Sequence, residues 1–409
     1  MAGAYAFHLL NANLVTSDAC PERLLWAQKG GQCSARGMST HEIDAQRVTE
    51  LITRCRKEVD EGLLPSCQIA IGFEGEIVVD ETIGDAVPET RYCFFSATKP
   101  FVAAAMWQLL SEDLVQLKAP VSSYLPEFAE NGKQEITVEQ VMLHTSGFPH
   151  APMGPNVWAT TKSRRQRMAD WRLNWEPGTR YEYHPTSAHW VLAEIINEVT
   201  GEHYADEIHR RVTTPLGLSR ILGIDPEDQE GIADLTLCEG EATPDELEAV
   251  FGVRSMPPSE VNDETIIRFN DPDTRAVGVP GGGGYGRAAD LAGFYQALLH
   301  NPGDVWDSTM LDNAVGQVHN NLPDPMGVPA NRGLGVILAG DDGMTNRRGL
   351  GRTVSPRAFG HNGVGGQIAF CDPDTGLSFA YATNGLDRHQ VRQPRRGTSI
   401  ASLAANCAV

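Results

Sequence analysis

The stretch Phe94-Phe95-Ser96-Ala97-Thr98-Lys99-Pro100 determines how the rest of this 409-residue chain is interpreted. It opens a strongly apolar run, continued by Met106 and Leu109, that predicts an interior helix. Residues three apart share a helical face, so the Ser96 hydroxyl and the Lys99 amine can meet. Burial lowers the pKa of such an amine and prepares it to act as a base, whereas the alternative is a lysine that reaches toward solvent. This is the only S-x-x-K match in the sequence, and it predicts a serine nucleophile.

Two β-rich runs, Cys67–Phe73 and Glu76–Glu81, precede this segment. The Glu74-Gly75 corner between them predicts an antiparallel hairpin. Earlier still, Ser39 and Glu42 form a capping box ahead of an apolar helical face, which predicts a helix start at Ser39.

The middle of the chain is predicted to be mainly helical. Thr137 and Gln140 form a second capping box, a helix starts at Thr186 and stops at Gly201, and Asp290 is expected to cap a further helix. The last third returns to strands, which are predicted over Gly335–Ala339, Gly366–Cys371 and Leu377–Thr383. Strands at both ends with helices between them indicate one sheet completed by distant segments.

The segment Tyr92–Lys99 resembles the nucleophile motif of serine β-lactamases, penicillin-binding DD-peptidases and family VIII carboxylesterases. Further segments match this superfamily in the same order, namely Pro120-Val121, Tyr124–Phe128, Ile136–Val138, His144–Gly147 and Pro215–Leu218. The resemblance runs from about Ile43 to Asn384. It is closest in character to the family VIII carboxylesterases, which are like class C β-lactamases.

The resemblance implies an α+β fold, in which an antiparallel sheet is flanked by helices as an α/β/α sandwich and a mainly helical domain is inserted. Residues 39–118 and 330–409 are predicted to form the α/β domain and residues 119–329 the helical domain, with the active site between them. Residues 1–38 look unlike the rest of the chain and are interpreted as an N-terminal extension, with Met38 as a candidate initiator.

The family's second element is a catalytic tyrosine, and the matching stretch here is Arg180–Thr186. The resemblance places Tyr183 in the catalytic position, where its phenol would relay a proton between serine, lysine and leaving group; the alternative is a half-buried packing residue. Pro185 departs from the family, which usually has an asparagine that helps hold a β-lactam's side-chain amide, because proline has no polar side-chain group. His184 replaces a small residue and is a candidate substrate-binding group.

The third element is His361-Asn362-Gly363, which fills the place of the family's K-T-G ahead of a predicted strand. By position, the backbone N–H of Val364 would join that of Ser96 in an oxyanion hole, flanked by Gly363 and Gly365. His361 replaces a lysine that would offer a cation to a substrate carboxylate, and histidine is largely neutral near pH 7. The change favours a neutral, apolar ester, unless this histidine only supports the strand end.

The run Gly281–Gly286 contains a G-x-G-x-x-G pattern. No strand or βαβ unit leads into it, so a nucleotide site is not predicted. We expect these glycines to let a loop pass close to the active site, with Tyr285 available to line it.

The composition and charge of the chain exclude some classes of binding partner. A formal net charge of −20 argues against nucleic acid, and no segment is long and apolar enough for a transmembrane helix. The eight cysteines are scattered without the spacing of a zinc site, so neither a metal nor another cofactor is predicted. Unpaired cysteines and the lack of a secretory signal predict a cytoplasmic protein. The expected partner is a small-molecule ester, and the oligomeric state stays open.

The function that these features favour is a serine carboxylesterase, which would hydrolyse short-chain or aryl esters through an acyl-Ser96 intermediate. A β-lactamase, a D-aminopeptidase or DD-peptidase, or an acyltransferase would use the same scaffold and the same kind of intermediate. The third alternative is a catalytically inactive relative that serves as a scaffold or binding protein, and it rests on Pro185.

Overall fold

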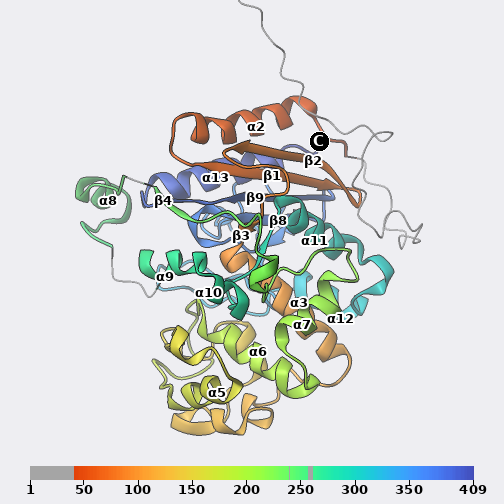
Figure 1. Cartoon of the computed structure of the whole chain (residues 1–409), viewed down its shortest axis with the longest axis vertical. Coiled ribbons are helices and arrows are strands. Elements are labelled where there is room, and N and C mark those ends of the chain that lie inside the picture. Colours follow the sequence, from red (N-terminus) through yellow and green to blue (C-terminus); the bar gives the residue numbers. More distant parts are fainter. Residues whose placement is uncertain (1–40, 239, 257–260) are drawn as a thin grey trace, which may run out of the picture.

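The computed structural model describes residues 41–238, 240–256 and 261–409 (Figure 1). The predicted N-terminal extension and the capping residue Ser39 lie outside these described residues. The first described helix, α2 (Ala45–Asp60), is capped by Asp44, whose side chain accepts from two backbone N–H groups of the first turn. Asp44, rather than the predicted capping box, therefore fixes the start of α2.

One large antiparallel sheet, with the strand order β2-β1-β9-β8-β7-β6, forms the centre of the described chain. Its strands are β1 (Ser66–Phe73), β2 (Glu76–Gly84), β6 (Ile337–Leu338), β7 (Phe359–Gly360), β8 (Ile368–Asp372) and β9 (Leu377–Thr383). β1 pairs with β2 through the predicted hairpin and with β9 on its other side, where Cys67 lies opposite Thr383. The prediction that distant segments complete one sheet is confirmed.

Helices cover both faces of this sheet (Figure 1). On β1, Ile69 and Ile71 pack in the core beneath α2 and α13 (Arg392–Ala405), while Ala70 packs in the larger core on the opposite face. The opposite face is covered by α11 (Ala288–His300), which contacts β1 and β9. Every residue of β1 is buried because both faces are covered.

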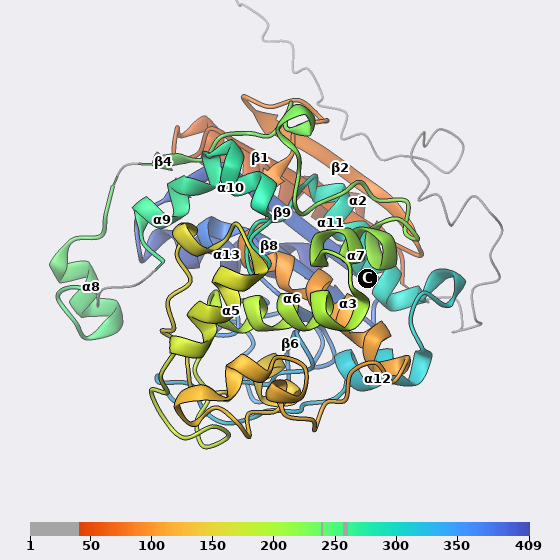
Figure 2. The ribbon, with the colours of Figure 1, turned by 60° about the horizontal axis from the view of Figure 1, so that its bottom comes forward.

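The larger core is built around α3 (Lys99–Ser111), which is apolar on most sides as the sequence predicted. The other helices of the described chain are α4 (Val138–Met142), α5 (Thr161–Asp170), α6 (Ser187–Thr200), α7 (Tyr204–Ile208), α8 (Pro244–Phe251), α9 (Asp263–Ile267), α10 (Pro272–Val277) and α12 (Ser308–Gly316). Figure 2 shows α5 and α6 in front of the sheet layer. No described helix has both the length and the hydropathy needed to cross a membrane.

The predicted domain boundary does not match the packing of α11. This helix lies within residues 119–329, the predicted helical domain, yet it covers the sheet. Its predicted cap is also displaced: Asp290 sits inside the first turn and accepts from the backbone N–H of Arg287 at 2.9 Å. By contrast, α4 carries its predicted capping box, and α6 ends at Gly201, where φ is +75°.

Candidate active site

Ser96 lies on a 3₁₀ turn, η1 (Phe95–Thr98), which leads directly into α3. The strand before it, β3 (Tyr92–Cys93), pairs with β5 (Tyr285–Gly286), which fixes the approach to this turn. Phe95 has φ of +47°, in the left-handed region that side chains other than glycine rarely adopt. Such strain is typical of residues whose position the surrounding structure imposes.

The side chains of Lys99 and Tyr183, both predicted from the sequence, meet at the Ser96 hydroxyl. Lys99 Nζ lies 3.1 Å from Ser96 Oγ, and Tyr183 donates its phenolic hydrogen to the same oxygen at 2.9 Å. Lys99 Nζ also lies 2.8 Å from the carbonyl oxygen of Pro185 and 2.5 Å from that of Gly281. Distant parts of the chain therefore converge on one oxygen atom.

Burial sets the protonation of the amine and the phenol. Burial, together with the nearby Arg332 charge, holds the pKa of Lys99 well below its ordinary value, and burial raises the pKa of Tyr183. A neutral amine has two hydrogens, which the two backbone carbonyls accept, so its lone pair remains for the proton of Ser96. The arrangement can pass a proton from Ser96 to Lys99 while the phenol keeps its own.

Ser96 and Val364, whose backbone N–H groups the sequence predicted for an oxyanion hole, border the same cavity. Val364 begins a second 3₁₀ turn, η9 (Val364–Gly366), and Ser96 is the second residue of η1. The first N–H groups of a helix have no acceptor inside it, and both residues line the same pocket. These two donors can therefore stabilise a negatively charged oxygen.

Gly363 and Gly365 shape this edge but do not line the pocket. A side chain at Gly363 would collide with the carbonyl oxygen of Phe94, so a glycine allows the strand end to approach the nucleophile. Gly365 has φ of +84°. Both glycines therefore affect the pocket indirectly, through the backbone path that they allow.

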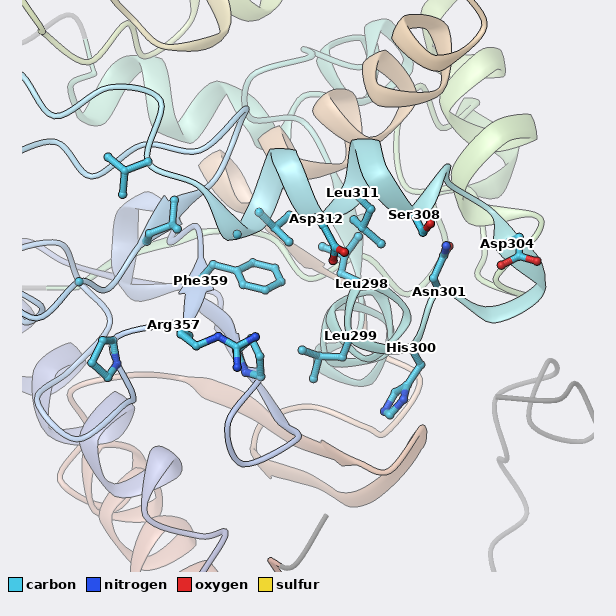
Figure 3. Close-up of a pocket in the computed structure, with 17 residues that line it drawn as sticks. Leu298, Leu299, His300, Asn301, Asp304, Ser308, Leu311, Asp312, Arg357 and Phe359 are labelled. Carbon is cyan, nitrogen blue, oxygen red and sulfur yellow. The ribbon is translucent and has the colours of Figure 1, made fainter. Parts of the chain in front are cut away.

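A cavity of about 400 Å³ borders Ser96. Its wall is mainly apolar and includes Phe95, Ile266, Phe269, Ile337 and Val364. A second cavity, of about 380 Å³, lies between the end of α11 and α12, as Figure 3 shows. It contains none of the residues around Ser96, so the first cavity is the candidate active site.

The two predicted histidines have different surroundings. His361 lines the pocket, and its Nδ1 lies 2.9 Å from the carbonyl oxygen of Asn362, so Nδ1 carries the proton and Nε2 is an acceptor. Burial and the nearby Arg332 and Lys99 charges hold the pKa of His361 well below its ordinary value. His361 is therefore uncharged.

His184 does not reach the pocket. Its Nδ1 lies 2.6 Å from the carbonyl oxygen of Glu182, and its Nε2 accepts from the backbone N–H of Phe148 at 3.2 Å. Both ring nitrogens are therefore occupied within the fold. The structure contradicts a substrate-binding role for His184, because its ring is fully buried and bonded to groups of the fold.

The glycine-rich loop passes beside the segment Ser96–Lys99, as expected. The Gly281 carbonyl contacts Lys99, and a Cβ at Gly284 would lie 2.6 Å from Thr98 Oγ1, so a side chain there would not fit. Tyr285, however, is buried behind the pocket wall. Its hydroxyl donates to the carbonyl oxygen of Phe269 at 2.8 Å, so it supports a lining residue instead of lining the pocket itself.

Arg332 is a pocket residue that the sequence analysis did not identify. Its side chain lines the cavity with 6% of its surface exposed. The guanidinium carbon lies 5.3 Å from the ring centre of Tyr183 and 5.6 Å from that of Tyr181, and Nε donates to the Tyr181 hydroxyl at 3.0 Å. The only signal in the sequence is a single charge immediately before the apolar run 333–339.

Comparison with known proteins identifies the family. The Beta-lactamase family model matches residues 51–402. The chain belongs to the β-lactamase family. The esterase/beta-lactamase LipL of Mycobacterium tuberculosis is 28% identical over 356 residues, covering 78% of this chain and 76% of the relative. A putative D-alanyl-D-alanine carboxypeptidase of Escherichia coli is 23% identical over 331 residues, covering 76% and 73%.

Solved structures in the β-lactamase family have the same fold. A family VIII carboxylesterase is 25% identical with a TM-score of 0.72, covering 90% of this chain and 99% of that one. A penicillin-binding protein homologue from Caulobacter crescentus is 24% identical with a TM-score of 0.70, over the same shares of the two chains. The resemblance and the fold class predicted from the sequence are confirmed, and the chain is a serine hydrolase of this family.

Two further buried histidines lie near Tyr183: His144 packs against the Tyr183 ring, and His189 packs against His144. The ring centre of His144 lies 4.9 Å from that of Tyr183, and His189 lies 6.0 Å from His144. Burial is the main reason that the pKa values of both are held well below the ordinary value. His144 belongs to the segment His144–Gly147, which resembles a family motif, but its position in the sequence did not indicate a contact with Tyr183. Within the described residues, no group of three His, Cys, Asp or Glu side chains is placed to hold a metal ion.

Proposed function

We propose that this chain is a serine carboxylesterase that hydrolyses short-chain or aryl esters through an acyl-Ser96 intermediate. The observation that carries the proposal is the contact of Ser96 Oγ with both Lys99 Nζ and the Tyr183 hydroxyl, at the edge of a mainly apolar cavity. This contact also argues against an inactive scaffold, because a nucleophile and a buried base lie within hydrogen-bonding distance.

In the proposed acylation step, Ser96 Oγ attacks the ester carbonyl carbon while Lys99 takes the hydroxyl proton. The N–H groups of Ser96 and Val364 stabilise the negative charge that develops on the carbonyl oxygen. Tyr183 gives its proton to the leaving alkoxide as the C–O bond breaks, and the Lys99 ammonium returns a proton to Tyr183. Water then attacks the acyl carbon, the same groups move its proton, and free Ser96 and a carboxylic acid result.

Two residues support an ester over a β-lactam or a peptide. Pro185 offers only its backbone carbonyl, which already contacts Lys99, so it cannot hold a substrate amide through a side chain. His361 is uncharged in the position where a lysine is usual. The relatives include both an esterase/beta-lactamase and a putative carboxypeptidase, so the acceptor must be tested directly.

The test compares wild type with Ser96→Ala on p-nitrophenyl butyrate, nitrocefin and a D-Ala-D-Ala peptide. We expect ester turnover in wild type, its loss in Ser96→Ala, and a transient acyl adduct on Ser96 detected by mass spectrometry. Ser122→Ala is the matched control, because the Ser122 hydroxyl donates to the carbonyl oxygen of Gln134 and does not line the pocket. Nitrocefin or peptide turnover faster than ester turnover would contradict the proposal.

A further inference from the structure

Three exposed arginines, Arg347, Arg352 and Arg395, line one cavity and form no ion pair with any described residue. The sequence around Arg395 shows how these residues differ from other arginines of the chain. Four arginines lie in the segment 388–396, and the other three each pair with an aspartate or a glutamate. The guanidinium groups that line the cavity therefore remain available to a ligand.

This cluster is positive in a chain that is strongly acidic overall. The sequence has 53 Asp and Glu against 33 Lys and Arg, a formal net charge of −20, yet no carboxylate is among the described residues that line the cavity. Glu246 does not neutralise Arg395: hydrogen bonds from Thr243 are the main cause of the lowered pKa of Glu246, and the charge of Arg395 contributes least. A cavity lined by charges of one sign concentrates ions of the opposite sign, so an anion is the expected ligand.

The polar walls of the cavity come from one face of α13 and from the loop between β6 and β7. Arg395 and Thr398 share a helical face because they are three positions apart. Arg347 and Arg352 lie on the loop, and the backbone N–H of Arg352 donates to the Ser402 hydroxyl of α13 at 3.0 Å. The loop is thereby tied to the helix, and both walls contribute guanidinium groups.

The donors on these walls fit a phosphate monoester. A single guanidinium can bind a carboxylate through two parallel hydrogen bonds, whereas this cavity offers three guanidinium groups together with the hydroxyls of Thr398 and Ser399. A phosphate monoester carries a charge of about −1.5 to −2 at pH 7 and three acceptor oxygens, which matches this larger set of donors.

The rest of the cavity suits the organic part of such a ligand. Phe251 of α8, Val391 and Pro394 give it an apolar side. Its volume of about 610 Å³ lies within the range of about 300–1,000 Å³ that is typical of small-molecule sites.

We infer that this cavity between α8 and α13 binds a small soluble phosphate monoester, with the phosphate between Arg347, Arg352 and Arg395 and the organic part against Phe251. The net charge of −20 disfavours the extended polyanions that also carry phosphate, namely nucleic acids and anionic membranes. None of the described residues that line this cavity also lines the Ser96 pocket, so the inference does not rest on the proposed function.

Isothermal calorimetry with phenyl phosphate tests the site on the full chain. Wild type should bind the probe, and Arg347→Gln/Arg395→Gln should bind it at least about 10-fold more weakly, because two charged hydrogen-bond donors are lost. The matched control is Arg167→Gln/Arg172→Gln, which removes the same charge from a different cavity, one that Asp170 also lines. This control should keep the wild-type affinity, and circular dichroism would check the fold of both variants.

Three results would overturn the inference. Wild type would fail to bind phenyl phosphate, or both double variants would lose affinity equally. Benzoate has a carboxylate in place of the phosphate and should bind wild type at least about 10-fold more weakly than phenyl phosphate, so equal affinities would overturn the assignment to phosphate.

A lipid headgroup also presents a phosphate monoester, so vesicles distinguish the two sources. Wild type would be sedimented with phosphatidylcholine vesicles that contain phosphatidic acid and with phosphatidylcholine vesicles alone, and we expect no difference between them. Sedimentation that requires phosphatidic acid and is lost in Arg347→Gln/Arg395→Gln would overturn the soluble ligand and assign the site to a lipid headgroup.

Discussion

Around Lys99, two backbone carbonyls take the place of side-chain partners. The oxygens of Pro185 and Gly281 accept from Lys99 Nζ, so in the neutral amine the lone pair is available for the proton of Ser96, 3.1 Å away. Pro185 is one of the residues at which this chain departs from its family's usual motifs, yet its carbonyl still contacts Lys99. The loss of the side-chain amide therefore leaves the backbone contact to Lys99 in place.

Replacing the base tests this arrangement directly. Lys99→Ala should lower the acylation rate by about 10²- to 10⁴-fold, the usual contribution of a positioned acid or base. Single-turnover kinetics with p-nitrophenyl butyrate would measure it, with circular dichroism as the check on folding. A folded Lys99→Ala protein with a near-normal acylation rate would exclude Lys99 from the mechanism.

The hydroxyl of Tyr183 can be removed while its ring is kept. Tyr183→Phe should reduce kcat by about 10²-fold or more, because the leaving group loses its proton donor. The matched control is Tyr124→Phe, which removes a hydroxyl that accepts from the Gln116 N–H, outside the pocket. Equal kcat values for the two variants would contradict the role of Tyr183.

The pH dependence of kcat should report the charge of Arg332. Burial and then this charge lower the pKa of Lys99, so activity should fall as the pH decreases through that pKa. Removing a nearby positive charge stabilises the ammonium form and raises the pKa. Arg332→Gln should therefore shift the acidic limb of the kcat–pH profile to higher pH, and Arg332→Lys should shift it less. An unchanged acidic limb in Arg332→Gln would show that the charge of Arg332 does not affect the pKa of Lys99.

At this scale, the sequence could reveal only residues joined by local spacing or by motif. Ser96 and Lys99 are three positions apart, and Tyr183 lies in a recognisable segment. Arg332 has no such link, because the fold alone brings the segment before β6 against the Tyr183 ring. The position of His184 next to Tyr183 could be read from the motif, but the direction of its ring could not.

Among the elements, the hairpin, α3 and α6 followed from periodicity and stop signals, whereas two helix starts did not. Acidic residues stabilise the first turn as well as the cap position, so an aspartate near a helix start is compatible with more than one register. Asp44 proved to be a cap, and Asp290 proved to lie inside the first turn. The sheet-covering position of α11 depends on tertiary contacts with β1 and β9, which no local pattern contains.

The packing of α3 against the segment before β6 can be tested at one glycine. Gly335 has φ of +96°, and a side chain there would collide with Ala103 of α3. Gly335→Ala should destabilise the protein by about 2–5 kcal/mol, from backbone strain together with overpacking. Denaturant unfolding would measure the loss.

Gly201, at the end of α6, provides the matched control for this experiment. It has φ of +75°, but no atom lies within 4 Å of the position a Cβ would take. Gly201→Ala should therefore cost only the backbone term, about 1–2 kcal/mol. Equal losses for the two variants would show that contact with α3 contributes nothing.

For the whole molecule, a group of buried neutral histidines makes stability depend on pH. Burial lowers the pKa of His184 from 6.5 to about 3, and it is also the main cause that lowers those of His144, His189 and His361. Below pH 6.5 the unfolded chain binds protons that the folded chain does not, so stability should fall as the pH decreases from 6.5 toward 3.

For His184 alone, this difference in proton binding amounts to about 2 kcal/mol at pH 5. Urea unfolding at pH 7 and pH 5 would measure it. His184→Asn should show a smaller loss between the two pH values than wild type, even if it is less stable at both. His319, which is not among the groups that lower the pKa of His184, gives the control His319→Asn, which should keep the wild-type loss; an identical loss in His184→Asn would contradict the prediction.

The pairing of β1 with β9 has a consequence for biosynthesis. The Thr383 hydroxyl donates to the carbonyl oxygen of Ser66, 317 positions away along the chain. A ribosome that adds about 5–20 amino acids per second needs roughly 15–60 s to translate that interval. Throughout this time the nascent hairpin presents an unpaired strand edge, the kind of template on which chains aggregate. Slower initiation, which leaves fewer nascent hairpins exposed at once, should therefore raise the yield of soluble protein.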